Sequence, residues 1–229
     1  MNFPKYLPRV APFAVYMLFV ATSEIIALIP ATSSLLSPES QTLLYPVKIT
    51  CALATLFFFY RHCNEIRWRE LSQLRQSSLS ISLGIAVFGL WIYLTQPWAV
   101  LSIPQTSFTP QAVPEGVPRT ALIAVRLAGA ALVVPIIEEL FWRSFLIRYL
   151  QKADFTSLPI GTISPLTFFG TALLFALEHH SVAAGFLAGL AYNTIYWRTR
   201  SIAQCILSHA VTNLLLGLYV IRYEQWWFW

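Results

Sequence analysis

Three short polar groups interrupt the apolar second half of this 229-residue chain, and their residue types can do chemistry. They are the carboxylates and guanidinium of EELFWR, the imidazole that ends FALEH, and the imidazole and amide of HAVTN: Glu138, Glu139, Arg143, His179, His209 and Asn213. A carboxylate, two imidazoles and an amide can activate a water molecule and stabilise an oxyanion. If the fold brings these groups together, the chemistry they predict is hydrolysis of an acyl bond.

The spacing within each group follows the turn of a helix. Residues four apart lie on one helix face, so Glu139 and Arg143 can form an ion pair. Glu138 lies about 100° around the same helix, which leaves it available for another role. Pro135 cannot donate a hydrogen bond to the helix and loosens the turn before it, and that loosening could open room for water beside Glu138.

The same side chains could instead bind a zinc ion. Glu138, His179 and His209 are of the types that bind zinc, but HExxH is absent and the three would come from separate helices. A divalent metal is therefore compatible with the sequence and not required by it, and the cofactor stays unknown. The three scattered cysteines form no CxxC pair. Serine-hydrolase, phosphate-loop and dinucleotide motifs are absent as well.

The composition indicates the class of protein. Apolar residues make up 57% of the chain and charged residues 11%, whereas soluble domains carry about 25% charged residues. The net charge of +5 does not indicate nucleic-acid binding, because the basic residues occupy short gaps between apolar runs. That pattern is typical of loops in membrane proteins. We therefore expect a multi-pass integral membrane protein that has the lipid bilayer, and no nucleic acid, as a partner.

The apolar runs predict an all-α, polytopic bundle of about seven transmembrane helices, or eight if a re-entrant piece lies within 179–197. The expected spans are 10–29, 43–60, 79–100, 120–147, 163–179, 182–197 and 201–221. Residues 1–119 would hold spans without a recognised motif, and residues 120–221 the motif-bearing helices of the same membrane-embedded unit.

The basic loops predict the orientation. The N-terminal segment and residues 61–75 are rich in Lys and Arg, and such loops face the cytoplasm, so we expect a cytoplasmic N-terminus. Counted from the cytoplasmic side at about 1.5 Å per residue, Glu138, His179 and Asn213 lie roughly 20 Å deep and His209 roughly 14 Å deep in a hydrocarbon core of about 30 Å. Three helices would thus deliver polar groups to a similar depth.

Outside EELFWR, FALEH and HAVTN, three charged residues lie within the expected spans. Lys48 and Arg126 are close enough to an interface for their charged ends to reach water. Glu24 lies deeper in the first span and is a candidate partner for Arg126 across helices. A structural role is our interpretation for all three.

In their order along the chain, the motifs resemble those of a known family. EELFWR fits EExxxR, FALEH fits FxxxH and HAVTN fits HxxxN, the motifs of the CAAX prenyl protease and bacteriocin-processing (Abi) family of intramembrane proteases. The resemblance covers about residues 120–217. It implies an endopeptidase that cleaves membrane-associated peptide or protein substrates within the bilayer, and the small size and loop charges fit a bacterial plasma membrane.

The resemblance also implies a role for each residue, carried over by motif position. Glu138 would be the general base that activates water, with assistance from His179. His209 and Asn213 would stabilise the oxyanion. The second carboxylate and the guanidinium of EELFWR would order the site.

Two functions without proteolysis would use the same residues. A membrane scaffold or a bacteriocin-immunity-type protein would keep the cluster for packing, because polar side chains join membrane helices. A small transporter would use the carboxylates and histidines as a proton relay, but the sequence shows no inverted repeat.

Overall fold

The structure, a computed structural model, describes residues 3–28, 37–95 and 108–229. This part of the chain folds into helices and contains no strand, which confirms the predicted all-α class. The long helices are α1 (Leu7–Leu28), α2 (Pro38–Phe59), α3 (Leu74–Leu94), α7 (Pro165–Leu177), α8 (Val182–Thr199) and α9 (Ile202–Tyr223). Residues 117–149 form one further helical segment, which contains α4 (Val117–Ala128), α5 (Val134–Glu139) and α6 (Ile147–Tyr149).

Four helices in the described ranges are long and apolar enough to cross a membrane. They are Glu39–His62, Leu74–Leu94, Val117–Tyr149 and Ile202–Tyr223. Leu7–Ser23 and Pro165–Leu177 are shorter apolar helices. The protein is therefore an integral membrane protein. Every predicted span overlaps a helical segment, although the last residue of the span 10–29 and the last residues of the span 79–100 lie outside the described residues.

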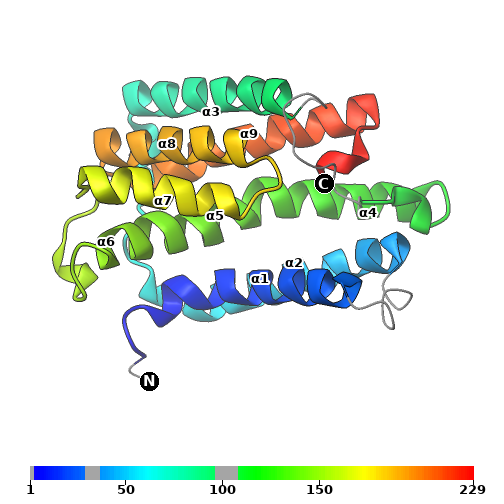
Figure 1. The fold of residues 1–229 in the computed structure, drawn as a ribbon, viewed down its shortest axis with the longest axis horizontal. Coiled ribbons are helices and arrows are strands. Elements are labelled where there is room, and N and C mark those ends of the chain that lie inside the picture. The colour runs from blue at the N-terminus through cyan, green and yellow to red at the C-terminus, as the bar shows by residue number, and fades with distance from the viewer. Residues whose placement is uncertain (1–2, 29–36, 96–107) are drawn as a thin grey trace.

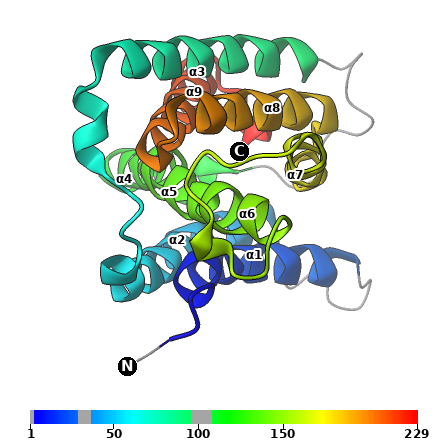
Figure 2. The same ribbon diagram turned by 90° about the vertical axis from the view of Figure 1, so that its left-hand side faces the viewer.

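The helices form layers around the segment 117–149 (Figure 1). α1 and α2 lie side by side on one side of it, and α7, α8 and α9 lie on the other. α3 forms the outermost layer, where it packs against α8 and α9 (Figure 2). A polar group in the middle of the central segment is therefore in a position to meet side chains from several helices.

The central segment widens on both sides of Pro135. Pro135 has no N–H to donate to the carbonyl four residues earlier, and the preceding turn, Gly129–Val133, is π-helical. A second π-helical stretch, Leu140–Leu146, follows α5. π-Helical turns are rare in proteins, and those that occur are often found at functional sites. The loosening predicted before Pro135 is confirmed, and the two glutamates of EELFWR lie on the short α-helical piece between the wide turns.

Capping residues fix where the motif-bearing helices begin. Ser164 and Thr167 form a reciprocal capping box at the start of α7, where Pro165 occupies the first helical position. The Ser201 side chain accepts from the N–H of Gln204 at the start of α9. Such caps satisfy N–H groups that a helix leaves unpaired. The positions of FALEH and HAVTN along the chain are thereby set from a defined starting residue.

Two glycines bring α8 close to α7. A Cβ on Gly185 would lie 3.0 Å from the Cα of Ala176, and a Cβ on Gly189 would lie 2.8 Å from the Cα of Ala172. Carbon atoms in good contact are about 3.5–4.0 Å apart, so neither position has room for a side chain. The small-xxx-small spacing of GFLAG serves this close approach of the two helix backbones.

The polar connections meet at one end of the bundle. Arg9 donates to Glu65 through Nε at 2.7 Å and through Nη2 at 2.9 Å, and the Ser144 hydroxyl donates to the same carboxylate. Lys5 lies 3.2 Å from Asp154. The N-terminal segment, the connection after α2 and the loop after α6 therefore lie on one side. The assignment of this side to the cytoplasm stays a prediction.

Candidate active site

A buried ion pair lies in the middle of the central segment. Arg143 donates through Nη1 to Oε1 of Glu139 at 3.1 Å, and the two side chains are 1% and 0% exposed. Taking two charges out of water costs several kcal/mol per ion unless each is paired and hydrogen-bonded. The ion pair predicted from the four-residue spacing is confirmed.

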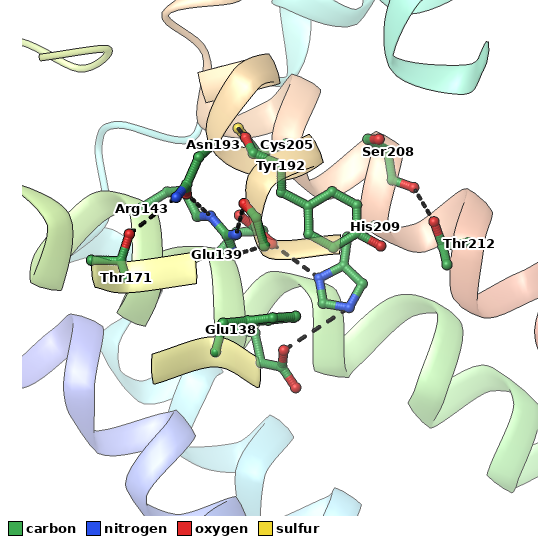
Figure 3. Close-up of polar contacts among 12 residues, drawn as sticks. Glu138, Glu139, Arg143, Thr171, Tyr192, Asn193, Cys205, Ser208, His209 and Thr212 are labelled. Carbon is green, nitrogen blue, oxygen red and sulfur yellow. Dashed lines mark hydrogen bonds and ion pairs between the residues drawn. The ribbon is translucent and has the colours of Figure 1, made fainter. Parts of the chain in front are cut away.

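Arg143 is held from a second side by α8. It donates through Nε to Oδ1 of Asn193 at 3.1 Å and through Nη2 to the carbonyl of Gly189 at 3.3 Å. The Asn193 amide donates in turn to the Phe168 carbonyl at 2.7 Å and to the Thr171 hydroxyl at 3.1 Å. The guanidinium therefore connects the central segment with α8 and, through Asn193, with α7 (Figure 3).

His209 of α9 lies between the two glutamates (Figure 3). Its Nδ1 is 3.0 Å from Oε1 of Glu139, and its Nε2 is 3.9 Å from Oε2 of Glu138. The carboxylate of Glu139 thus contacts both a guanidinium and an imidazole. With Nδ1–H donated to Glu139, the second nitrogen of His209 faces Glu138.

Aromatic rings surround the two imidazoles. Tyr192 is stacked on His209, with ring centroids 4.7 Å apart and planes 19° from parallel. Phe175 lies 6.1 Å from His209 and 4.6 Å from His179. Trp91 meets His179 edge-on at 5.2 Å. Rings packed in this way hold both histidines in defined orientations.

Glu138 borders a cavity. Its side chain is buried, and its Oε2 has no hydrogen-bond partner among the described residues. It lines a cavity of about 370 Å³ and a second one of about 200 Å³, which share several of their walls. His179, His209 and Asn213 line the smaller cavity together with Glu138. The four residues predicted to be catalytic therefore border one space.

His179 and Asn213 reach this space while bonded to backbone carbonyls. The Nδ1 of His179 is 2.8 Å from the carbonyl of Phe175, and a proton donated there leaves Nε2 as an acceptor in the neutral ring. The Asn213 amide donates one N–H to the carbonyl of Ala130 at 2.9 Å and has a second N–H to give. In the part of the chain that the structure describes, neither side chain is hydrogen-bonded to Glu138; His209 approaches it, with Nε2 3.9 Å from Oε2.

The predicted zinc ligands do not assemble as a ligand set. Among the residues that the structure describes, no group of three or more His, Cys, Asp or Glu side chains is arranged to hold a metal ion. Glu138 and His209 approach each other, and the contact of His179 Nδ1 with the Phe175 carbonyl leaves Nε2 as the free nitrogen of that ring. Zinc binding at this site therefore remains an alternative, compatible with the sequence and not required by it.

Three residues of the site lie outside EELFWR, FALEH and HAVTN. Asn193 and Gly189 hold Arg143, and Tyr192 stacks on His209. The position of Asn193 within a span was a usable signal, because polar groups at membrane depth are costly. A tyrosine in an apolar helix gives no comparable signal, since aromatic residues are common throughout this chain.

Residues 120–215 match the model of a family described as type II CAAX prenyl endopeptidase Rce1-like. The matched range contains EELFWR, FALEH and HAVTN, so the resemblance to the CAAX protease family stated from these motifs is confirmed for this part of the chain. No curated protein and no solved structure matches. The match covers the helices that border the smaller cavity with carboxylate, imidazole and amide groups, and it supports an activity of the CAAX protease type in a membrane protein.

Proposed function

We propose that the protein is an intramembrane endopeptidase that hydrolyses peptide bonds of membrane-associated peptides or proteins. The observation that carries the proposal is the single cavity bordered by Glu138, His179, His209 and Asn213. It lies in the part of the chain that matches an endopeptidase family. A carboxylate that activates water and donors that receive an oxyanion are the two requirements of peptide-bond hydrolysis.

Glu138 is the general base. Its Oε2 is buried without a protein partner and borders the cavity, so a water molecule bound there would satisfy it. Glu138 takes a proton from this water while the water oxygen attacks the scissile carbonyl, and it later gives the proton to the leaving amine. His179 assists, because Nε2 can accept a hydrogen bond from the same water while Nδ1–H donates to the Phe175 carbonyl.

His209 and Asn213 stabilise the tetrahedral oxyanion. When the His209 ring is protonated, Nδ1–H donates to Glu139 and Nε2–H is left for the oxyanion. Asn213 contributes the N–H that the Ala130 carbonyl does not use. Donors held in place before the reaction need no reorganisation as charge develops, which is why such groups lower the barrier.

Glu139 and Arg143 are positioning residues. They are almost completely buried and bond to other protein groups instead of bordering the cavity. Glu139 orients the His209 ring by contact with Nδ1, and Arg143 holds Glu139. Because Arg143 is hydrogen-bonded to α8, the position of that helix affects where Arg143 holds Glu139.

The proposal includes a bacterial plasma membrane as the location and a cytoplasmic N-terminus. The N-terminal segment and the loops after α2 and α6 meet at one end of the bundle, and these segments hold many of the basic residues. Basic loops remain on the cytoplasmic side during insertion. The substrate is then a peptide segment that reaches the cavity within the bilayer.

The test is cleavage by the purified full-length chain in liposomes. Peptides that end in a CAAX sequence, with and without a prenyl group, are incubated with the wild type, Glu138→Gln and His179→Ala. Mass spectrometry then detects release of the C-terminal fragment. General acid–base catalysis contributes about 10²–10⁴-fold to a rate, so both variants should lose cleavage while their thermal unfolding in detergent is unchanged.

Residues of the same types outside the cavity provide matched controls. Glu115→Gln and His62→Ala change exposed side chains and should cleave as the wild type does. Full cleavage by both Glu138→Gln and His179→Ala would refute the proposal. If these two variants lose stability and no peptide is cut by any form, the cluster instead serves a scaffold or an immunity-type protein.

A further inference from the structure

The larger cavity beside Glu138 has a basic wall that the hydrolysis proposed for the site does not use. Lys48 of α2 and Arg126 of α4 line this cavity of about 370 Å³, which Glu138 and His179 also line. Both cations belong to helices long and apolar enough to cross a membrane, and both are half-buried. Charged groups within membrane spans are costly and most often serve a function.

Aromatic rings hold the two cations in place. Lys48 Nζ lies 4.5 Å from the ring centroid of Tyr16 and 5.2 Å from that of Tyr45. Arg126 Cζ lies 4.4 Å from the Tyr45 centroid and 5.2 Å from the Trp229 centroid. The Tyr45 hydroxyl also donates to the Arg126 carbonyl at 3.3 Å. Cations and rings therefore alternate along this wall, and one tyrosine lies next to both charges.

Stacking on rings leaves the N–H groups of both cations available. Among the residues whose side chains the structure describes, neither Lys48 nor Arg126 has a carboxylate at ion-pair distance. The side chain of Glu24, the predicted partner of Arg126, lies outside the described residues. Two like charges beside one ring repel each other in a medium of low dielectric constant. An anion bound at both would remove this repulsion and accept their hydrogen bonds.

Basic and acidic side chains line the same cavity. Glu138 and Glu178 line it together with the cations, and Tyr16, which contacts Lys48, also lines it. Cavities that bind small ligands measure about 300–1,000 Å³, so the volume of about 370 Å³ fits a short peptide segment. A ligand suited to this space has an anionic group at one point and a hydrolysable bond at another.

We propose that Lys48 and Arg126 form a subsite for a carboxylate of the peptide substrate and thereby determine specificity. This inference rests on the endopeptidase function proposed for Glu138. A guanidinium matches the two oxygens of a carboxylate with paired donors, and an ammonium adds a compact charge. The carboxylate is either the free C-terminus of the peptide or an acidic side chain, and both present the same chemistry to the two cations.

Equilibrium binding of labelled peptides to the inactive Glu138→Gln protein in detergent tests the subsite. The probe peptide has a free C-terminus and one acidic residue. It is compared with its C-terminal amide and with a form in which Gln or Asn replaces the acidic residue. A hydrogen-bonded charge pair is typically worth tenfold or more in affinity, so one of the two replacements should weaken binding at least ~10-fold and thus identify the source of the carboxylate.

The discrimination should disappear when the cations are removed. With Lys48→Met and Arg126→Gln introduced into the Glu138→Gln protein, the acid and its neutral form should bind equally. Lys152→Met and Arg222→Gln, which change exposed cations, should keep the discrimination. If the double change prevents folding, Lys48→Arg and Arg126→Lys retain the charges and should retain a preference for the acid.

Several outcomes would overturn the subsite. Equal binding of acid and neutral peptides by the Glu138→Gln protein would do so, as would undiminished discrimination without the two cations. Stabilisation by phosphatidylglycerol vesicles that depends on Lys48 and Arg126, without any peptide discrimination, would assign the cations to lipid instead.

Discrimination by a protein that cuts no peptide would retain the subsite and reject the proposed function. Equal cleavage of acid and neutral peptides would retain the function and reject the subsite.

Discussion

The imidazole of His209 and the carboxylate of Glu139 are 3.0 Å apart, from Nδ1 to Oε1, and both side chains are buried. The same carboxylate oxygen accepts from Arg143 at 3.1 Å. The orientation of a proposed catalytic imidazole is therefore tied to an ion pair that does not line the cavity. Stability of the helix bundle and geometry of the site depend on one carboxylate.

Arg143→Met should destabilise the protein strongly. It leaves the buried carboxylate of Glu139 without its main partner, and breaking a buried pair in this way costs about 3–5 kcal/mol. Adding Glu139→Gln should restore part of the lost stability, because the uncompensated charge is then gone. Thermal unfolding in detergent measures both effects. Activity should stay low in the double variant, because His209 has lost its orienting carboxylate; an unfolding temperature unaffected by Arg143→Met would contradict the central role of the ion pair.

Tyr192→Leu should lower the cleavage rate and should destabilise the protein less than Arg143→Met does. The Tyr192 ring is stacked on His209 at 4.7 Å, and an aromatic pair contributes about 0.5–1.5 kcal/mol beyond burial. The corresponding loss in kcat/KM is about 2–13-fold. Tyr192→Phe retains the ring and should keep near-normal activity, so kinetics of the two variants separate stacking from the hydroxyl. Equal rates for Leu and Phe would show that the stack does not orient the imidazole.

The motifs and spacing of the sequence determined a large part of the site. The spacing of Glu139 and Arg143 predicted their pairing, and depth counted along helices predicted that the groups near Glu138, His179 and Asn213 would meet. Both inferences use helix geometry, which is local and regular. The site geometry shows the limit of this approach: His179 borders the same cavity as Glu138, but it lies just after the end of α7 and bonds to the Phe175 carbonyl of that helix.

Contacts between residues far apart in the chain were not accessible in this way. Asn193 accepts a hydrogen bond from Arg143, and Gly189 lets α8 approach α7 closely. Such partner choices depend on how whole helices pack. The partners of Glu65 were not predictable either. Glu65 lies in the polar connection after α2, and it accepts hydrogen bonds from both Arg9 and Ser144. Composition and periodicity carry no information about which helix neighbours which.

Gly189→Ala should destabilise the α7–α8 contact and reduce activity. The added Cβ would lie 2.8 Å from the backbone Cα of Ala172, so the helices must separate, and overpacking of this kind costs about 1–3 kcal/mol. Separation also moves the Gly189 carbonyl that accepts from Arg143. Thermal unfolding and peptide cleavage both report the change.

Gly170→Ala is the matched control for this glycine. It lies in α7, and a Cβ there meets no heavy atom within 4 Å, so the helix should gain stability by roughly 0.5–1 kcal/mol from the lower chain entropy of alanine. Similar unfolding temperatures for the two variants would show that the close approach at Gly189 does not constrain the bundle.

Removal of divalent metal should leave cleavage intact. A catalytic zinc site has three protein ligands and an open position for water, and no trio of that kind comes together in the described parts of this chain. Glu138 and His209 lie 3.9 Å apart, and among the described residues no third His, Cys, Asp or Glu side chain joins them in a metal-binding arrangement. Cleavage by protein dialysed against EDTA or 1,10-phenanthroline should therefore equal that of untreated protein. Elemental analysis of the treated sample verifies that metal is absent. A loss of activity that zinc restores, together with loss of zinc binding in Glu138→Gln and His209→Ala, would show that the side chains rearrange to form a metal site and would replace the metal-free reaction proposed for Glu138.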